Sequence, residues 1–265
     1  MSGFKPGIEP ETITLLTDFG EQDAYVAIMK GVMSRINPQV RMIDISHTIR
    51  QGDIRSAAFV ADQAFSFFPV GTVHLIVVDP GVGTDRRALA VQAGSWYWVA
   101  PDNGVLSFIY KRFPDAVIVS LDQPEYWLDD QSSTFHGRDI FSPVAAHLSA
   151  GVSIDKVGTP VRNVEHGYSP GPDIRKSKIR GEIIYIDHFG NCVSNIPSRL
   201  LKSVAFIKFK KLTLRMLFTT YGEVESGTTL ALVGSHKYLE IAVSNGNAAE
   251  RLDVHMGDRV TVYLN

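Results

Sequence analysis

The feature that most constrains this fold is a change of hydrophobic period between residues 163 and 178. Before it, short apolar runs such as Ile13 to Leu16 alternate with stretches of helical spacing such as Tyr25 to Ile36. After it, short runs of alternating polar and apolar residues follow one another closely. The first pattern is typical of strands joined by helices, and the second of antiparallel strands joined by turns. We therefore expect two domains of different fold class.

The first domain is expected over residues 1–163 as an α/β domain, with a mostly parallel sheet flanked by helices. The run Leu75 to Val78 has no polar alternation, which indicates a strand buried on both faces. The helices are expected at Tyr25 to Ile36, Ile54 to Phe67, Gly104 to Phe113 and Ile140 to Ala150.

The second domain is expected over residues 179–265, after a linker at 164–178 whose Gly and Pro residues show no periodicity. Closely spaced strands with Gly and Asn turns predict a small antiparallel β-barrel, with a sandwich as the alternative. The expected strands are Gly181 to Ile186, Ala205 to Phe209, Leu212 to Leu214, Thr229 to Val233, Leu239 to Val243 and Arg259 to Leu264.

The composition is that of a globular protein, with 45% hydrophobic and 20% charged residues. A formal net charge of −2 offers no general attraction for a phosphate backbone, so no nucleic-acid partner is expected. The apolar runs are strand-sized and the N-terminal segment lacks a signal-peptide core, so we expect no membrane partner and a cytoplasmic location. The single cysteine, Cys192, excludes an intramolecular disulfide framework.

Polar residues that follow strands are the first candidates for a site, because ligands of open parallel sheets bind beyond the carboxyl ends of the strands. Asp18 and Asp23 follow the first strand, and a carboxylate at Asp18 could accept two hydrogen bonds from a vicinal diol. The alternative is that one of them caps the helix that begins near Tyr25.

Three further residues supply the parts of a water-activating site. Asp79 follows the most apolar strand, Arg86 lies across a glycine-containing loop from it, and His136 precedes the last helix of the first domain. The alternatives are a glycine turn closed by an ion pair and a structural histidine.

In the second domain the candidates are Asp187, Asn191 and Ser235. An Asn side chain pairs a donor with an acceptor, which suits an adenine edge, although turn chemistry explains the same residues. No two candidate ligands share a recognised metal-binding spacing and no nucleophile elbow is present, so metal and covalent catalysis are disfavoured.

Taken together, motifs along nearly the whole chain resemble those of the SAM hydroxide adenosyltransferase (SAM hydrolase) family, where SAM is S-adenosyl-L-methionine. This family is related to the bacterial fluorinase and chlorinase. The motifs are Thr17 to Gly20, Ile45 to His47, Val78 to Thr84, Ala100 to Gly104, Thr134 to Asp139, Ile186 to Asn191 and Gly246 to Ala249.

The resemblance implies hydrolysis of SAM to adenosine and L-methionine, by in-line attack of water or hydroxide on the ribose 5′ carbon, with no cofactor and no metal. It also implies a homotrimer in which each site lies between the first domain of one subunit and the second domain of a neighbour. The family's catalytic residues fall on Asp79, Arg86 and His136, its ribose-binding carboxylate on Asp18, its methionine contacts on Asp23, Asp187 and Ser235, and its adenine-pairing amide on Asn191.

Two alternatives to hydrolysis remain open: a SAM-dependent halide transferase of the chlorinase kind, and a non-catalytic SAM- or adenosine-binding protein. The carboxylate of Asp79 argues against halide transfer, because it would repel an anion. The presence of Asp79, Arg86 and His136 together argues against a protein that only binds.

Overall fold

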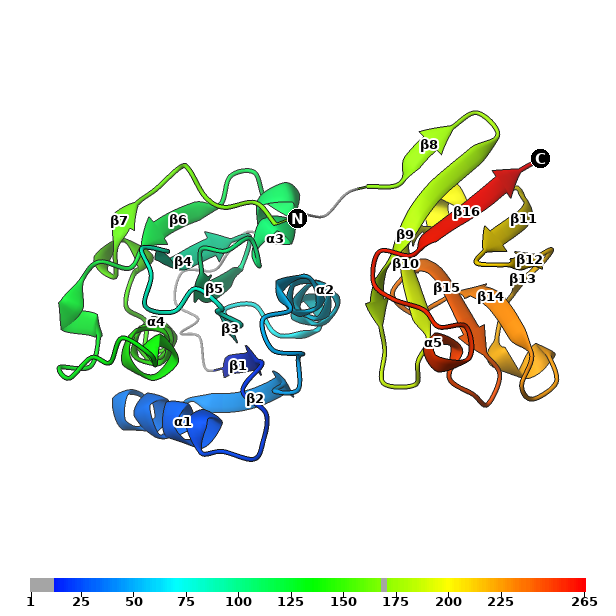
Figure 1. Ribbon diagram of the computed structural model, residues 1–265. Coiled ribbons are helices and arrows are strands. Elements are labelled where there is room, and N and C mark those ends of the chain that lie inside the picture. The colour runs from blue at the N-terminus through cyan, green and yellow to red at the C-terminus, as the bar shows by residue number, and fades with distance from the viewer. Residues whose placement is uncertain (1–11, 168–170) are drawn as a thin grey trace. The chain divides into compact units, whose positions relative to one another are not determined.

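The computed structural model describes residues 12–167 and 171–265, which form two compact units that divide near residue 168. Residues 1–11 of the expected first domain and 168–170 of the expected linker lie outside the described part. Figure 1 shows the longer helices in the N-terminal unit, whereas the C-terminal unit consists almost entirely of strands. Each unit is described by itself.

A seven-stranded sheet in the order β2-β1-β3-β5-β4-β6-β7 forms the centre of the N-terminal unit. The pairs β2–β1, β1–β3 and β3–β5 are parallel, and β4, β6 and β7 extend the sheet with antiparallel pairs. Every residue of β1 and β3 is buried, as expected for strands covered on both faces. The strands are β1 (Thr12–Thr17), β2 (Arg41–Ser46), β3 (Val73–Val77), β4 (Ala88–Ala93), β5 (Trp96–Pro101), β6 (Val117–Ser120) and β7 (Thr159–Pro160).

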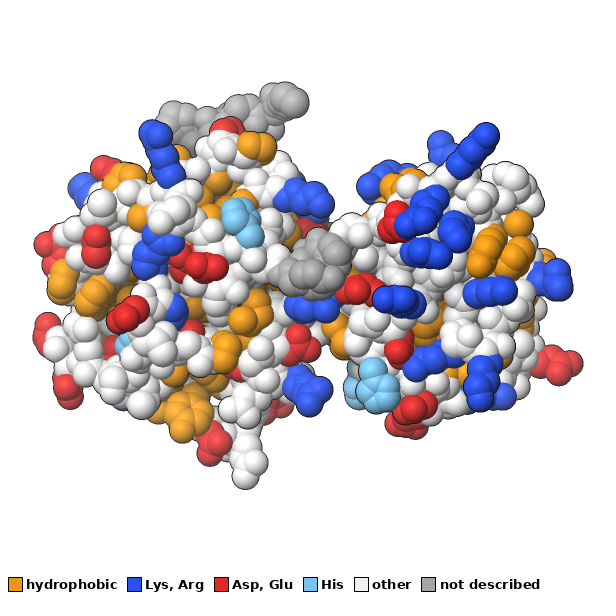
Figure 2. Space-filling view, turned by 45° about the horizontal axis from the view of Figure 1, so that its top comes forward, with side chains coloured by type: hydrophobic (Ala, Val, Ile, Leu, Met, Phe, Trp, Pro, Cys, Tyr) orange, Lys and Arg blue, Asp and Glu red, His pale blue; other side chains and the backbone are white. Residues whose placement is uncertain are grey.

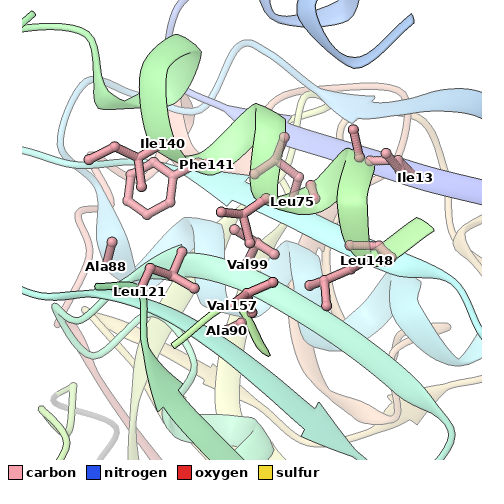
Figure 3. Close-up of a cluster of buried hydrophobic side chains, with 14 of the residues drawn as sticks. Ile13, Leu75, Ala88, Ala90, Val99, Leu121, Ile140, Phe141, Leu148 and Val157 are labelled. Carbon is pink, nitrogen blue, oxygen red and sulfur yellow. The ribbon is translucent and has the colours of Figure 1, made fainter. Parts of the chain in front are cut away.

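Helices cover both faces of this sheet. Helices α1 (Tyr25–Ile36) and α4 (Ser142–Ser149) lie on one side, and α2 (Ile54–Ala64) and α3 (Ser107–Arg112) on the other (Figure 1). Figure 3 shows the apolar cluster on the α4 side, where Phe141 and Leu148 pack with Leu75 and Val99 of the sheet. The expected α/β architecture with a flanked, mostly parallel sheet is confirmed.

Three expected helices are shorter than predicted. Helix α2 ends at Ala64 and is followed by a 3-10 turn at Phe65–Phe67, and α4 begins at Ser142, after a π-helical turn at Gly137–Phe141. Helix α3 begins at Ser107 rather than at Gly104. Gly104 has a φ of +90°, and a Cβ there would overlap the backbone of Gly167. The local spacing suggested helix, but the backbone at Gly104 is left-handed because a distant segment packs against it.

The C-terminal unit is a nine-stranded sheet in the order β12-β11-β16-β9-β10-β15-β14-β13, with β8 paired to β9. The long strand β9 pairs with β16 along its first half and with β10 along its second, so the sheet curls into a barrel-like form. Apart from β13–β14, the pairings of its described strands are antiparallel, which confirms the expected barrel class. The elements are β8 (Asp173–Arg175), β9 (Lys178–Ile186), β10 (Cys192–Pro197), β11 (Val204–Phe209), β12 (Leu212–Leu214), β13 (Leu217–Phe218), β14 (Thr229–Val233), β15 (Tyr238–Val243), α5 (Ala248–Arg251) and β16 (Arg259–Leu264).

The sequence analysis did not predict strand β10. All six of its residues are buried, so it lacks the alternation that identified the other strands. Ser194 and Asn195 resemble turn residues in sequence, but the hydroxyl of Ser194 donates a 2.9 Å hydrogen bond to the carbonyl of Leu239 on β15. A tertiary contact therefore satisfies a buried polar group of a residue type that is common in turns.

The charge of the chain is unevenly divided. Residues 171–265 hold thirteen Lys and Arg against nine Asp and Glu. Figure 2 shows many basic side chains on the face of the C-terminal unit that is turned toward the viewer. The net charge of −2 for the whole chain is therefore the sum of a basic C-terminal unit and an acidic N-terminal one.

Across the described residues, no helix combines the length and apolar character that a bilayer span requires.

Candidate active site

Three side chains from two loops of the N-terminal unit meet beyond the carboxyl end of β3. Arg86 donates from Nε to both carboxylate oxygens of Asp79, at 2.9 Å each, and from Nη2 to Oδ2. The same Nη2 lies 2.9 Å from Nδ1 of His136. The side chains of Asp79 and Arg86 are only 5% and 10% exposed. Arg86 therefore joins a carboxylate and an imidazole in one largely buried cluster.

The loop 79–86 brings Arg86 back to Asp79 through two tight turns. Val82 N donates to the carbonyl of Asp79 at 3.2 Å, and Thr84 N donates to that of Gly81 at 3.1 Å. Gly83 has a φ of +78°, and a Cβ there would lie 2.6 Å from the carbonyl oxygen of Ser133. Glycine is thus required both by the backbone conformation and by the close approach of the loop that carries His136.

The protonation state of His136 follows from its surroundings. Burial lowers the pKa of its imidazole, and the positive charge of Arg86 lowers it further. Because Nδ1 accepts a hydrogen bond from Arg86, the neutral ring carries its proton on Nε2. His136 therefore offers an N–H donor at Nε2 and is neutral at neutral pH.

Two cavities border this cluster. One, of about 360 Å³, is lined by Asp79 and His136, and the other, of about 550 Å³, by Asp18, Gly52 and Asp79. Arg86 is not among the described residues that line either cavity. Its guanidinium lies instead 5.2 Å from the ring centroid of the buried Phe141. Asp79 is thus the carboxylate common to both cavities, and Arg86 supports it from the core.

An aromatic wall, which the sequence analysis did not single out, borders the same cavities. Phe19 and Tyr25 line both of them, and Phe135 lines the smaller. The rings of Tyr25 and Phe135 meet edge to face at 5.2 Å, and those of Phe19 and Phe135 at 5.9 Å. Phe19 and Phe135 directly adjoin Asp18 and His136 in sequence, and this adjacency was the available signal.

The two acidic candidates after β1 are in different environments. Asp18 lines the larger cavity, and its Oδ2 accepts a 2.8 Å hydrogen bond from the backbone N–H of Gly52. Its Oδ1 has no hydrogen-bond partner within the described part of the chain. Asp23 is exposed. The capping alternative is wrong for both, because the N-cap of α1 is Ala24 and no side chain caps that helix.

In the C-terminal unit, Asp187 and Asn191 lie in one tightly bonded loop. Oδ1 of Asp187 accepts from the backbone N–H groups of Phe189 and Asn191, at 2.9 and 2.8 Å. Its Oδ2 accepts from Nδ2 of Asn191 at 2.9 Å. The carboxylate thus shapes the loop that presents the amide.

A second C-terminal loop packs against the first. The backbone of Gly190 has a φ of +81°, and a Cβ there would overlap the side chain of Asn247. Ala249 N donates to the carbonyl of Gly190 at 2.9 Å. Ser235 is exposed in the turn between β14 and β15. The structure therefore brings the Asp187 and Asn247 motifs together within this unit.

Comparison with known families agrees with this arrangement of motifs. The family model for the SAM hydroxide adenosyltransferase N-terminal domain matches residues 13–158, and that for the C-terminal domain matches residues 181–261. The chain belongs to the SAM hydroxide adenosyltransferase family. The family resemblance inferred from the sequence is confirmed.

Relatives within the SAM hydroxide adenosyltransferase family extend over almost the whole chain. The (R)-S-adenosyl-L-methionine hydrolase of Salinispora tropica is 38% identical, and the match covers 94% of this chain and 97% of the relative. A fluorinase of Nocardia brasiliensis is 26% identical, with 94% and 96% covered. The crystal structure of an uncharacterized conserved protein from Thermotoga maritima has a TM-score of 0.89 at 36% identity, with 95% and 99% covered.

Within residues 12–167 and 171–265, no three or more His, Cys, Asp or Glu side chains are grouped so that they could hold a metal ion.

Proposed function

We propose that this protein is a SAM hydrolase, which transfers the adenosyl group of SAM to water and releases adenosine and L-methionine. The observation that carries the proposal is the Asp79–Arg86–His136 cluster beside a cavity, in a chain of this family. Relatives named (R)-S-adenosyl-L-methionine hydrolase are 29–38% identical, whereas fluorinases are 25–26% identical. The chain is therefore more similar to the hydrolases than to the halide-transferring relatives.

This reaction needs little covalent assistance, because a sulfonium is already a good leaving group. The oxygen of water forms a bond to C5′ while the C5′–S bond breaks. The sulfur keeps the bonding electron pair and becomes the thioether of methionine. One proton must leave the attacking water. The protein has to hold that water in line with the C5′–S bond, exclude other solvent and accept the proton.

The three clustered residues divide these tasks. In the proposed mechanism His136 orients the water by donating a hydrogen bond from Nε2, and Asp79 accepts the proton. An attacking water becomes strongly acidic as its bond to carbon forms, so a carboxylate paired with Arg86 is basic enough. Arg86 holds both groups from the core side, and its charge favours the hydroxide character that develops on the water.

The remaining candidates bind the two ends of the substrate. Asp18 would accept from the ribose hydroxyls through Oδ1, and Asn191 would pair with the adenine edge. Asp23, Asp187 and Ser235 would contact the methionine end. Asp187 retains acceptor capacity at Oδ2 for the ammonium group, since that oxygen accepts one hydrogen bond inside its loop.

The family resemblance also supports a homotrimer in which the N-terminal unit of one subunit and the C-terminal unit of a neighbour complete each site. We expect light scattering on the purified protein to give three times the mass of one chain. A monomer that is fully active would contradict this assembly.

The test of the function is turnover of SAM in water enriched in ¹⁸O, followed by mass spectrometry of the products. Hydrolysis places the label in the 5′ hydroxyl of adenosine, with an equal amount of methionine released. Activity should be unchanged after treatment with a chelator. Chlorinated adenosine formed in the presence of chloride would identify a halide transferase, and SAM binding without turnover would identify a binding protein; either result overturns the proposal.

A further inference from the structure

The loop 101–104 supports the strand end from which Asp79 projects. The parallel ladder between β3 and β5 ends at the pair Leu75 and Val99, before the chain reaches Asp79. Beyond that point, Nδ2 of Asn103 donates a 2.9 Å hydrogen bond to the carbonyl of Val78, the residue that directly precedes Asp79. The ladder with β1 on the other edge of β3 continues to Val77, so on the β5 side a side-chain amide takes over the support that the main-chain ladder no longer gives.

Asn103 is itself held in place. Its Oδ1 accepts a hydrogen bond from the backbone N–H of Val105 at 3.2 Å, and the backbone N–H of Asn103 donates to the carbonyl of Pro101 at 3.0 Å. The side chain is therefore fixed at both its donor and its acceptor ends, and it is partly buried.

The same loop also secures the other end of the segment 79–86. Asp102 is 5% exposed, and its Oδ2 accepts from Nε and Nη2 of Arg87 at 2.9 and 2.5 Å. The backbone N–H of Asp102 donates to the carbonyl of Arg87 at 2.9 Å. Since Arg87 directly follows Arg86, loop 101–104 holds the flanks of both partners of the Asp79–Arg86 ion pair.

We propose that Asn103 is a positioning residue for the hydrolysis: its amide fixes the backbone that aims the Asp79 carboxylate at Arg86 and at the attacking water. This inference rests on the proposed function. Without the bond, the carbonyl of Val78 loses its donor and the backbone at Asp79 can shift. A displacement of about 1 Å at a reacting group costs roughly 100-fold in rate, whereas the groups proposed to bind substrate are untouched.

The chain offers a closely matched control. Asn37 donates from Nδ2 to the hydroxyl of Ser149 at 3.0 Å, and its Oδ1 accepts from the N–H of Gln39 at 3.2 Å. Like Asn103, it is partly buried, but it lies at the end of α1 and lines neither cavity. Asn37→Ala therefore removes the same kind of bonds without reaching loop 79–86.

The experiment compares Asn103→Ala, Asn103→Asp and Asn37→Ala in full-length protein. Asn103→Asp keeps an acceptor for Val105 but replaces the donor to Val78 with a carboxylate oxygen, which also adds a negative charge; it serves if the alanine variant does not fold. Both Asn103 variants should lower kcat by roughly 10- to 100-fold with KM for SAM within about threefold. Asn37→Ala should match the wild type in both constants.

A second readout does not require activity. The imidazole nitrogen shifts of His136, measured by NMR, report the hydrogen bond from Arg86, and they should change in both Asn103 variants but not in Asn37→Ala. Wild-type kcat in the Asn103 variants, a rise in KM alone, or unchanged His136 shifts would each overturn the positioning role. If the wild type lacks activity while the shifts still respond to Asn103, the proposed function fails and the structural link stands.

Discussion

Two aspartates, one in each unit, stand in loops that follow a strand, and the two loops use their carboxylates differently. Both carboxylate oxygens of Asp79 accept hydrogen bonds from Arg86, a cation from the same loop, and Asp79 lines both cavities. The carboxylate oxygens of Asp187 accept hydrogen bonds from backbone N–H groups of its own loop and from the side-chain amide of Asn191. The first carboxylate therefore meets a cation beside the cavities, and the second mainly fixes the shape of a loop.

The largest effect is expected for Asp79→Asn, which keeps the size of the side chain and removes its basicity. A lost proton acceptor should lower kcat by about 10²- to 10⁴-fold, because general-base catalysis contributes that much. The matched change Asp187→Asn should keep kcat within about tenfold, with its effect in KM. Steady-state release of adenosine checks both. Equal losses of kcat in the two variants would show that the comparison between the loops is wrong.

An intermediate effect is expected on folding. Asp187→Ala leaves the N–H groups of Phe189 and Asn191 without their acceptor. Phe189 is exposed, so water can replace the lost acceptor there, whereas Asn191 is buried. A buried donor without a partner costs about 1–3 kcal/mol, so the free energy of unfolding should fall by roughly that amount. Denaturant titration followed by circular dichroism measures it, with His188→Ala, at an exposed position of the same loop, as the control. An unchanged midpoint would mean that Asp187 does not hold its loop.

The smallest effect is expected in the pH profile. The pKa of His136 is lowered by burial and by Arg86, so the ring becomes protonated only below the ordinary value of 6.5. Protonation of Nδ1 would remove the acceptor for Arg86 and set two positive charges side by side. The acid limb of kcat/KM should therefore lie below pH 6.5, with activity retained above it. An acid limb above 6.5 would contradict the neutral His136 on which the mechanism depends.

Local patterns predicted much of the fold. Helix α1 spans the residues expected from its spacing, and strands β12 and β14 also have their expected bounds. The errors occur where a distant contact overrides the local pattern. Gly104 lies outside α3 because Gly167 packs against it, and β10 is a strand because Ser194 bonds to β15. Neither partner is near in sequence.

The candidate site was partly predictable in the same sense. The motif residues identified Asp79, Arg86 and His136 as a set, whereas the ionic contact and the hydrogen bond between them are properties of the folded unit. The aromatic wall of Phe19, Tyr25 and Phe135 and the support from Asn103 were not predicted. Adjacency to Asp18 and His136 was a signal for Phe19 and Phe135, but nothing local shows that the amide of Asn103 bonds to the backbone at the end of a neighbouring strand.

By itself, the sequence determined the division into an α/β unit and a β unit, the family, and the residue types available for chemistry. Hydrophobic period and motif order are properties of the sequence itself, so they can be recognised without the folded structure. Only the tertiary structure decided which carboxylate meets a cation beside a cavity and which is bonded within its own loop. That choice depends on contacts between segments far apart in sequence, as between Arg86 and His136, and no local pattern records them.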